Sequence, residues 1–252
     1  MVIIKNSQEI EIMRQGGRLL ARILKIVINR AKAGVNTKEL DSLAESLIIR
    51  AGGAPSFKGY NNFPTTLCTC LNTQLVHAPA IPARILQNGD ILTIDIGMRY
   101  PAEKGLCTDM AVTVPIGRIT PEVRKLLQVT EKALILGIRI IKPGRKTGDL
   151  GALIQSYVER QGFSVVRDLV GHGVGLMVHE DPRIPNYGRP GTGAEFKENM
   201  TIAVEPMVSA GHWAIKESTN DHVIEMADGS LCAHFEHTLL ITKKGCEILT
   251  KV

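Results

Sequence analysis

The chain carries an internal repeat with an offset of 110 residues, found by setting Gly34 against Gly144 (144 − 34 = 110). Further identities follow at this offset without a gap: Thr37 and Thr147, Leu40 and Leu150, Leu43 and Leu153, Ser46 and Ser156, Arg50 and Arg160, and Gly52 and Gly162. A shared helical pattern inflates the leucine matches, but seven identities in one helix-length segment are hard to obtain by chance. We therefore expect residues 1–252 to form a single domain of two related halves, approximately 1–115 and 116–252.

Each half is expected to begin with two helices and to continue as strands. The expected helix starts are Asn6 with Glu9 as its capping-box partner, Thr37, Thr120 followed by Pro121, and Thr147 or Asp149 as a cap. Apolar residues recur at helical spacing after each start, whereas the segments that follow each pair alternate at the period of a strand or contain glycine-rich turns. This order predicts the α+β fold class.

Two strands with acidic residues form the centre of the first half. Residues 91–98 and 107–114 alternate between apolar and polar positions, and the polar break from Arg99 to Gly105 favours a hairpin loop. Pairing the strands puts Asp95 and Asp109 on the same face. Neighbouring carboxylates in an apolar sheet repel each other and resist desolvation, so they lie at a solvated edge, share a proton or bind a cation.

The second half offers two more acids on strands. The repeat offset carries Asp95 onto Glu205, and Glu236 is the counterpart expected for Asp109. A two-fold arrangement would bring all four acids to one cleft, together with His172 from the glycine-rich residues 170–175, although such a histidine also fits an ordinary turn. Four carboxylates and one imidazole suit Mn²⁺, Fe²⁺, Co²⁺ or Zn²⁺, and two divalent cations would balance the four acids in charge.

The composition restricts the class of protein. With 44% hydrophobic and 22% charged residues, the chain has an ordinary globular composition. No basic region followed by an apolar run marks a signal peptide, and no apolar run has membrane-spanning length. Five cysteines, an odd number without framework spacing, indicate a reducing compartment, so a cytoplasmic location is expected. The net charge of +5 fits a solvated surface or weak attraction to a polyanion such as RNA.

Six strings resemble the motifs of type I methionine aminopeptidase: Thr93-Ile94-Asp95-Ile96-Gly97, Thr108-Asp109, Gly171-His172-Gly173-Val174-Gly175, His179-Glu180-Asp181-Pro182, Val204-Glu205-Pro206-Met207 and Phe235-Glu236-His237-Thr238. The similarity runs almost from end to end, and these motifs are highly specific to dinuclear metallopeptidases. The resemblance implies the pita-bread fold, in which two pairs of helices flank a curved antiparallel sheet with pseudo-twofold symmetry. It also implies five metal ligands: Asp95 on one ion, His172 and Glu205 on the other, and Asp109 and Glu236 bridging both.

The resemblance further implies how a peptide would be bound and cleaved. Two divalent ions (Co, Mn, Fe or Zn) would activate water, and Glu205 would move its proton. His179 matches a histidine that contacts the substrate carbonyl, and His77 matches one that bonds the scissile amide, although a lone histidine is more often structural. Tyr60, Phe63 and Cys68 would line the methionine pocket, with plain core packing as the alternative.

The sequence departs from the family pattern at four places: a longer loop between Asp95 and Asp109, Ala78 after His77, Val178 before His179, and His222 where a tryptophan is common. None of these departures changes a metal ligand. They therefore affect the selectivity of the pocket more than the chemistry.

The expected function is removal of the initiator methionine from nascent proteins when the second residue is small. The expected protein is a monomer without membrane contact, with transient ribosome association as a further expectation. One alternative is an X-Pro aminopeptidase of the same fold, which the lack of a large amino-terminal domain in this sequence disfavours. Another is a non-catalytic protein that binds RNA or the ribosome, which should have lost a metal ligand, whereas all five are present.

Overall fold

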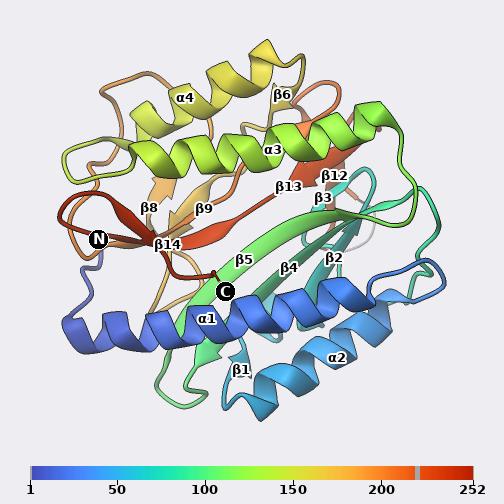
Figure 1. Ribbon diagram of the computed structural model, residues 1–252, viewed down its shortest axis with the longest axis horizontal. Helices are drawn as coiled ribbons and strands as arrows, with labels where there is room; N and C mark the ends of the chain where they lie inside the picture. Colours follow the sequence, from blue (N-terminus) through green and yellow to red (C-terminus); the bar gives the residue numbers. More distant parts are fainter. Residues whose placement is uncertain (1, 219–221, 252) are drawn as a thin grey trace.

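The computed structural model describes residues 2–218 and 222–251, and in them the chain forms four α-helices in two pairs (Figure 1). These are α1 (Ser7–Arg30), α2 (Thr37–Arg50), α3 (Pro121–Ile140) and α4 (Thr147–Arg160), and a 3-10 turn, η1, spans Tyr60–Asn62. None of the helices within those ranges has the length and apolar character needed to cross a bilayer.

Local capping explains most of the helix starts. The Asn6 side chain accepts the backbone N–H of Glu9, whose carboxylate accepts that of Asn6, so the expected capping box is confirmed. Thr120 caps α3, as expected. The expected cap of α4 was wrong: Lys146 occupies the N-cap position, while Thr147 and Asp149 lie inside the first turn. The carboxylate of Asp149 still takes part in capping, because its Oδ2 accepts a hydrogen bond from the backbone N–H of Lys146 at 2.9 Å.

All strand pairings in the described residues are antiparallel and fall into four sheets. The first contains β1 (Ala54–Pro55), β2 (Leu67–Leu71), β4 (Ile91–Tyr100) and β5 (Leu106–Pro115), and the second contains β6 (Ser164–Val165), β10 (Met207–Ser209) and β13 (Cys232–His234). The third contains β3 (Gln74–Val76), β11 (Ile215–Glu217) and β12 (Ile224–Met226). The fourth contains β7 (Gly171–Gly173), β8 (Glu180–Ile184), β9 (Thr201–Val204), β14 (His237–Ile241) and β15 (Cys246–Ile248).

The expected hairpin is formed by β4 and β5, but its loop is shorter than the polar break indicated. Arg99 and Tyr100 still pair with Cys107 and Leu106, so β4 continues past the residues in which apolar alternation is visible. The register opposes Asp95 to Ala111 and Gly97 to Asp109. The two acids are therefore diagonal neighbours on one face of the hairpin.

The helices cover the faces of the sheets that point away from these acids. Leu20 and Leu24 of α1 belong to a buried cluster with Ile94 of β4. A second cluster joins α3 and α4 to the second half, for example through Ile154 and Ile202. Figure 1 shows α1 and α2 on one side of the strands and α3 and α4 on the other. The acid-bearing faces therefore meet in the middle of the molecule.

Candidate active site

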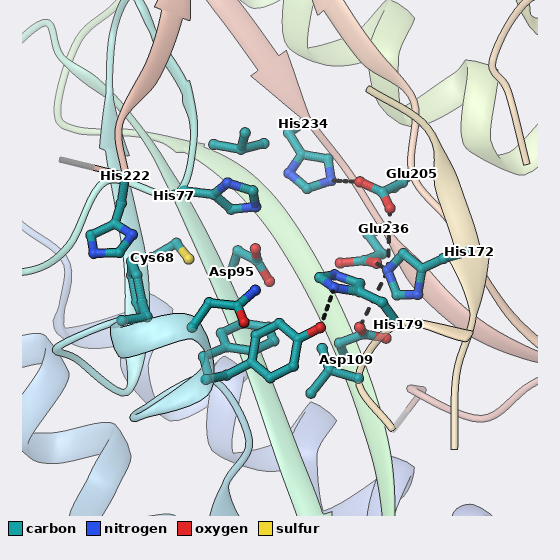
Figure 2. A pocket seen from close by; sticks show the side chains of 16 residues that line it. Cys68, His77, Asp95, Asp109, His172, His179, Glu205, His222, His234 and Glu236 are labelled. Atoms are coloured by element: carbon teal, nitrogen blue, oxygen red, sulfur yellow. Dashed lines mark hydrogen bonds and ion pairs between the residues drawn. The ribbon is translucent and has the colours of Figure 1, made fainter. Parts of the chain in front are cut away.

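All ten residues expected at the site line one cavity of about 180 Å³ (Figure 2): Tyr60, Phe63, Cys68, His77, Asp95, Asp109, His172, His179, Glu205 and Glu236. Four strands or their ends supply the acids. Asp95 and Asp109 lie on β4 and β5, Glu205 follows β9, and Glu236 lies between β13 and β14. The backbone N–H of Glu236 donates to the carbonyl of Ala111 at 2.9 Å, which joins the two halves directly at the site.

His172 is the common neighbour of three acids. Its Nε2 lies 3.7 Å from Asp109 Oδ2, 3.4 Å from Glu205 Oε1 and 4.0 Å from Glu236 Oε1. Its Nδ1 lies 2.8 Å from the carbonyl oxygen of Gly173, and because a carbonyl can only accept, Nδ1 carries the hydrogen. In the neutral ring, the lone pair on Nε2 then points toward the acids, as a metal-binding imidazole requires.

Burial raises the pKa of all four carboxyls. The pKa of Asp95 rises to about 7, because burial and the charges of Asp109 and Glu205 outweigh the opposing effect of His234. Burial and Asp109 raise the pKa of Glu205 to about 8. The pKa of Glu236 is also raised well above its usual range, first by burial and then by the other acids, and burial raises that of Asp109. Without a counter-charge, this cluster holds protons near neutral pH.

The donor set fits divalent cations. Ligand atoms of Asp109, His172 and Glu236 lie within 4.8 Å of one another, and Glu205 lies beside His172. Oδ1 of Asp95 is buried and has no hydrogen-bond partner among the described residues. An unsatisfied buried carboxylate oxygen is costly unless a cation meets it. Carboxylate oxygens with one imidazole nitrogen suit Mn²⁺, Fe²⁺, Co²⁺ or Zn²⁺.

Two neutral histidines lie beside the acids. The ring centroids of His179 and His172 are 4.4 Å apart, and the two rings are nearly perpendicular. His179 Nδ1 lies 3.3 Å from the Tyr60 hydroxyl oxygen. Burial lowers the pKa of His179 to about 4, assisted by His172 and His77, and burial with His234 and His222 lowers that of His77 to about 4. The φ of His77 is 59°, a left-handed conformation that non-glycine residues adopt mainly where the surroundings impose it.

The side of the cavity next to Asp95 is largely apolar and contains sulfur. Cys68 is 3% exposed and pairs with Asp95 across β2 and β4, and burial raises the pKa of its thiol. Phe63 lies edge-on to His222, with ring centroids 5.6 Å apart. Phe63 and Cys68 also belong to one small buried cluster, so packing and cavity lining coexist here. Val178 completes the lining near His179.

Sequence reasoning missed the polar residue of the cavity that lies against Glu205, which is His234. Its side chain is 2% exposed, and its Nε2 lies 3.3 Å from Glu205 Oε2. The signal that could have found it is the period of a strand, because His234 precedes Glu236 by two residues and so shares its face. A second hollow of about 590 Å³ adjoins the site, shares His77, His179 and Glu205, and extends to Met177.

Comparisons with known proteins agree with this geometry. Residues 11–243 match metallopeptidase family M24. The chain is 46% identical to methionine aminopeptidase 1 of Bacillus subtilis over the full length of both chains. A crystal structure of methionine aminopeptidase from Thermotoga maritima superposes with a TM-score of 0.96 at 40% identity, again covering both chains completely.

A more distant neighbour shares the fold alone. The prolidase of Pyrococcus furiosus has a TM-score of 0.76 at 24% identity, and the match covers 99% of this chain and 66% of that one. These neighbours confirm the expected α+β class and pita-bread fold. The chain belongs to metallopeptidase family M24, among its type I methionine aminopeptidases.

Proposed function

We propose that this protein removes the amino-terminal methionine of nascent polypeptides by metal-dependent hydrolysis when the second residue is small. The observation that carries the proposal is the convergence of four buried acids and His172 on one cavity, in a chain that matches methionine aminopeptidases over its full length. Asp95, Asp109, His172, Glu205 and Glu236 would hold two divalent cations, most simply because two such ions balance four carboxylates.

The bound cations would supply Lewis acidity, which makes water a better nucleophile and a carbonyl a better electrophile near neutral pH. Glu205 would take the proton of the attacking water and deliver it to the leaving amine. His179 uses Nδ1 toward Tyr60, which leaves Nε2 for the carbonyl oxygen of the substrate. His77 would bond the scissile amide, and its low pKa keeps it an uncharged partner.

The cavity lining supports methionine as the first residue of the substrate. A thioether packs well against aromatic rings and sulfur, and the cavity offers Phe63, Tyr60 and Cys68. His77 and His179 lie between this cavity and the adjoining hollow, since both residues line both spaces. A bulky second residue would meet these rings, and even a small displacement of the scissile bond is costly in rate.

Metal removal and a peptide panel test the proposal together. Chelation should abolish hydrolysis of Met-Ala peptides, and Mn²⁺, Fe²⁺ or Co²⁺ should restore it, while Met-Leu should be cleaved poorly. Full activity after verified metal removal would contradict the metal-dependent mechanism. Equal turnover of Met-Ala and Met-Leu would contradict the second-residue claim, and a preference for Lys, Pro or acidic first residues would remove the methionine assignment.

We also propose that residues 1–252 act as one catalytic domain, and as a monomer, in the cytoplasm. All five cysteines lie in the described part of the chain and are unpaired there, in keeping with a reducing compartment. The net charge of +5 favours transient contact with the RNA of the ribosome.

The alternative function, an X-Pro aminopeptidase, is supported by the fold alone, because the prolidase neighbour is only 24% identical.

A further inference from the structure

His234 is a buried polar side chain at the site with no role in the chemistry described so far. Its ring lines the cavity, is 2% exposed, and has no hydrogen-bond partner on either nitrogen in residues 2–218 and 222–251. Figure 2 shows the ring directed at Glu205, whose Oε2 lies 3.3 Å from Nε2. A buried imidazole without a hydrogen-bond partner costs free energy. Its presence here therefore indicates a hydrogen bond that forms when cations occupy the site.

The backbone fixes where this ring lies. The N–H of His234 donates to Thr113 Oγ1 at 2.9 Å, and that hydroxyl donates to the carbonyl of His234, also at 2.9 Å. Because Thr113 has only one hydroxyl hydrogen, Thr93 must donate in the 2.8 Å contact between the two threonines. On its other side, His234 pairs with Met207 of β10. Two strands therefore hold His234 from both sides.

Glu205 is held between two imidazoles, and only one of them can donate to it when both are neutral. Oε1 faces His172 Nε2 at 3.4 Å, and Oε2 faces His234 Nε2 at 3.3 Å. The hydrogen of His172 is on Nδ1, where it bonds Gly173, so its Nε2 carries a lone pair. Among the described side chains near Glu205, His234 is thus the available N–H donor to its carboxylate.

We infer that His234 is a positioning residue, whose Nε2–H bonds Glu205 Oε2 and thereby directs Oε1 toward His172 and the metal centre. The inference rests on the proposed metal-dependent function. A small shift would shorten the 3.3 Å contact into the ordinary hydrogen-bond range. Partners of this kind orient a metal ligand, and their loss typically weakens metal affinity by about 10- to 100-fold.

The test measures Mn²⁺ binding to the metal-free protein by titration calorimetry. His234→Leu removes the donor but keeps an apolar side chain in the space, and should weaken Mn²⁺ binding by at least about tenfold. His234→Gln keeps an N–H donor and should bind within about threefold of the wild type. His222→Leu, a matched change of another histidine in the same cavity, should leave Mn²⁺ affinity unchanged.

The outcomes separate this inference from the proposed function. If the wild type binds no Mn²⁺, the metal centre and the inference both fail. If the wild type binds Mn²⁺ and His234→Leu binds it equally well, only the inference fails, and it also fails if His234→Gln is as weak as His234→Leu. A crystal structure of the Mn²⁺-loaded protein in which His234 ligates the ion directly would replace the positioning role by a ligand role.

A double-mutant cycle keeps the test decisive if His234→Leu folds poorly. In a Glu205→Ala background, His234→Ala, which also removes the donor, and its parent should bind Mn²⁺ with the same affinity, whereas His234→Ala alone should weaken binding by at least about tenfold. Circular dichroism spectra should match the wild type for every variant used. If changing His234 weakened Mn²⁺ binding as much in that background as in the wild type, the inference would be overturned, because His234 would then act independently of Glu205.

Discussion

Removing bound cations should make the stability of this protein fall as pH rises above about 6.5. The reason is the pair Asp95 and Glu205, whose pKa values in the metal-free protein rise to about 7 and about 8, first because of burial. In the unfolded chain, both carboxyls are ionised throughout this range. The folded state therefore binds protons that the unfolded state does not, and this contribution is lost as pH rises through the folded pKa values.

The magnitude follows from integrating the bound protons. Between about pH 6.5 and about pH 8.5, Asp95 contributes a loss of about 1 kcal/mol and Glu205 a loss of about 2 kcal/mol. This pH range avoids most of the opposing effect of His77 and His179, whose pKa values are lowered to about 4 in the folded protein. Those two histidines, together with His237, whose pKa is also lowered to about 4, oppose the trend mainly below about pH 7, where the unfolded histidines take up protons that the folded ones refuse. The two acids together thus contribute a fall of about 3 kcal/mol.

Urea unfolding in the presence of a chelator measures this fall. Asp95→Asn cannot titrate at this position and should reduce the fall by about 1 kcal/mol, whereas Glu122→Gln, at the exposed start of α3, should leave it unchanged. Saturating Mn²⁺ should flatten the pH dependence, because bound cations keep the carboxylates ionised and their binding releases protons. Stability that stays constant or rises between about pH 6.5 and about pH 8.5 in the chelated protein would refute the reasoning.

Three further changes separate metal binding, chemistry and folding. Asp109→Ala should lose metal occupancy, measured by elemental analysis of the purified protein, because this acid is expected to bridge both ions. His179→Ala should keep the metal and lower kcat by about 100-fold or more, and an unchanged kcat with weaker metal binding would contradict the assigned roles. Lys5→Met should cost about 3 kcal/mol in urea unfolding, because it strands the buried Glu180, whose Oε2 lies 2.7 Å from Lys5 Nζ. Arg14→Met, in a partly exposed ion pair, is the matched control and should cost less than about 1 kcal/mol.

The positions of the acids could be anticipated from the sequence because they depend on strand period and on the repeat. Alternation placed Asp95 and Asp109 on one face, and the structure has them as diagonal neighbours there. The offset of the repeat led from Asp95 to Glu205, and both line the same cavity. Their catalytic and metal-binding roles stay predictions, tested by the substitutions above.

The strand period places His234 on the face of Glu236, but it does not single this histidine out as a functional residue. It lies between Ala233 and Phe235 in an apolar strand, where a histidine usually has a structural role. Its proximity to Glu205 arises from the pairing of β13 with β10, a long-range contact that local patterns do not specify. The chemistry of this position became visible only when the ring was found against Glu205 without other partners.

The wrong cap of α4 has a physical explanation in the repeat itself. Thr147 does not cap its helix, because its hydroxyl accepts the N–H of Ala194 from a distant loop. Thr37, its equivalent in α2, uses its hydroxyl in the same way toward the N–H of Arg84, and 194 − 84 is again 110. Thr37 and Thr147 are therefore identical in the repeat because both accept a hydrogen bond from a distant loop. The sequence analysis had explained Thr147 by a local role, the capping of α4.

The same contacts explain why Asp95 and Glu205 follow the repeat, whereas other parts of the candidate site do not. Leu86 and Phe196, 110 residues apart, accept the N–H groups of Gly34 and Gly144 and so fix the chain just before the strands of Asp95 and Glu205. The second pair of acids breaks the offset, because 236 − 109 is 127. The extra length in the second half includes β11 and β12, and β12 pairs with β3 next to His77. The repeated elements thus bring acids from both halves to the candidate site, and the unrepeated strands lie on one side of it only, so that the proposed metal centre would have a directional substrate pocket.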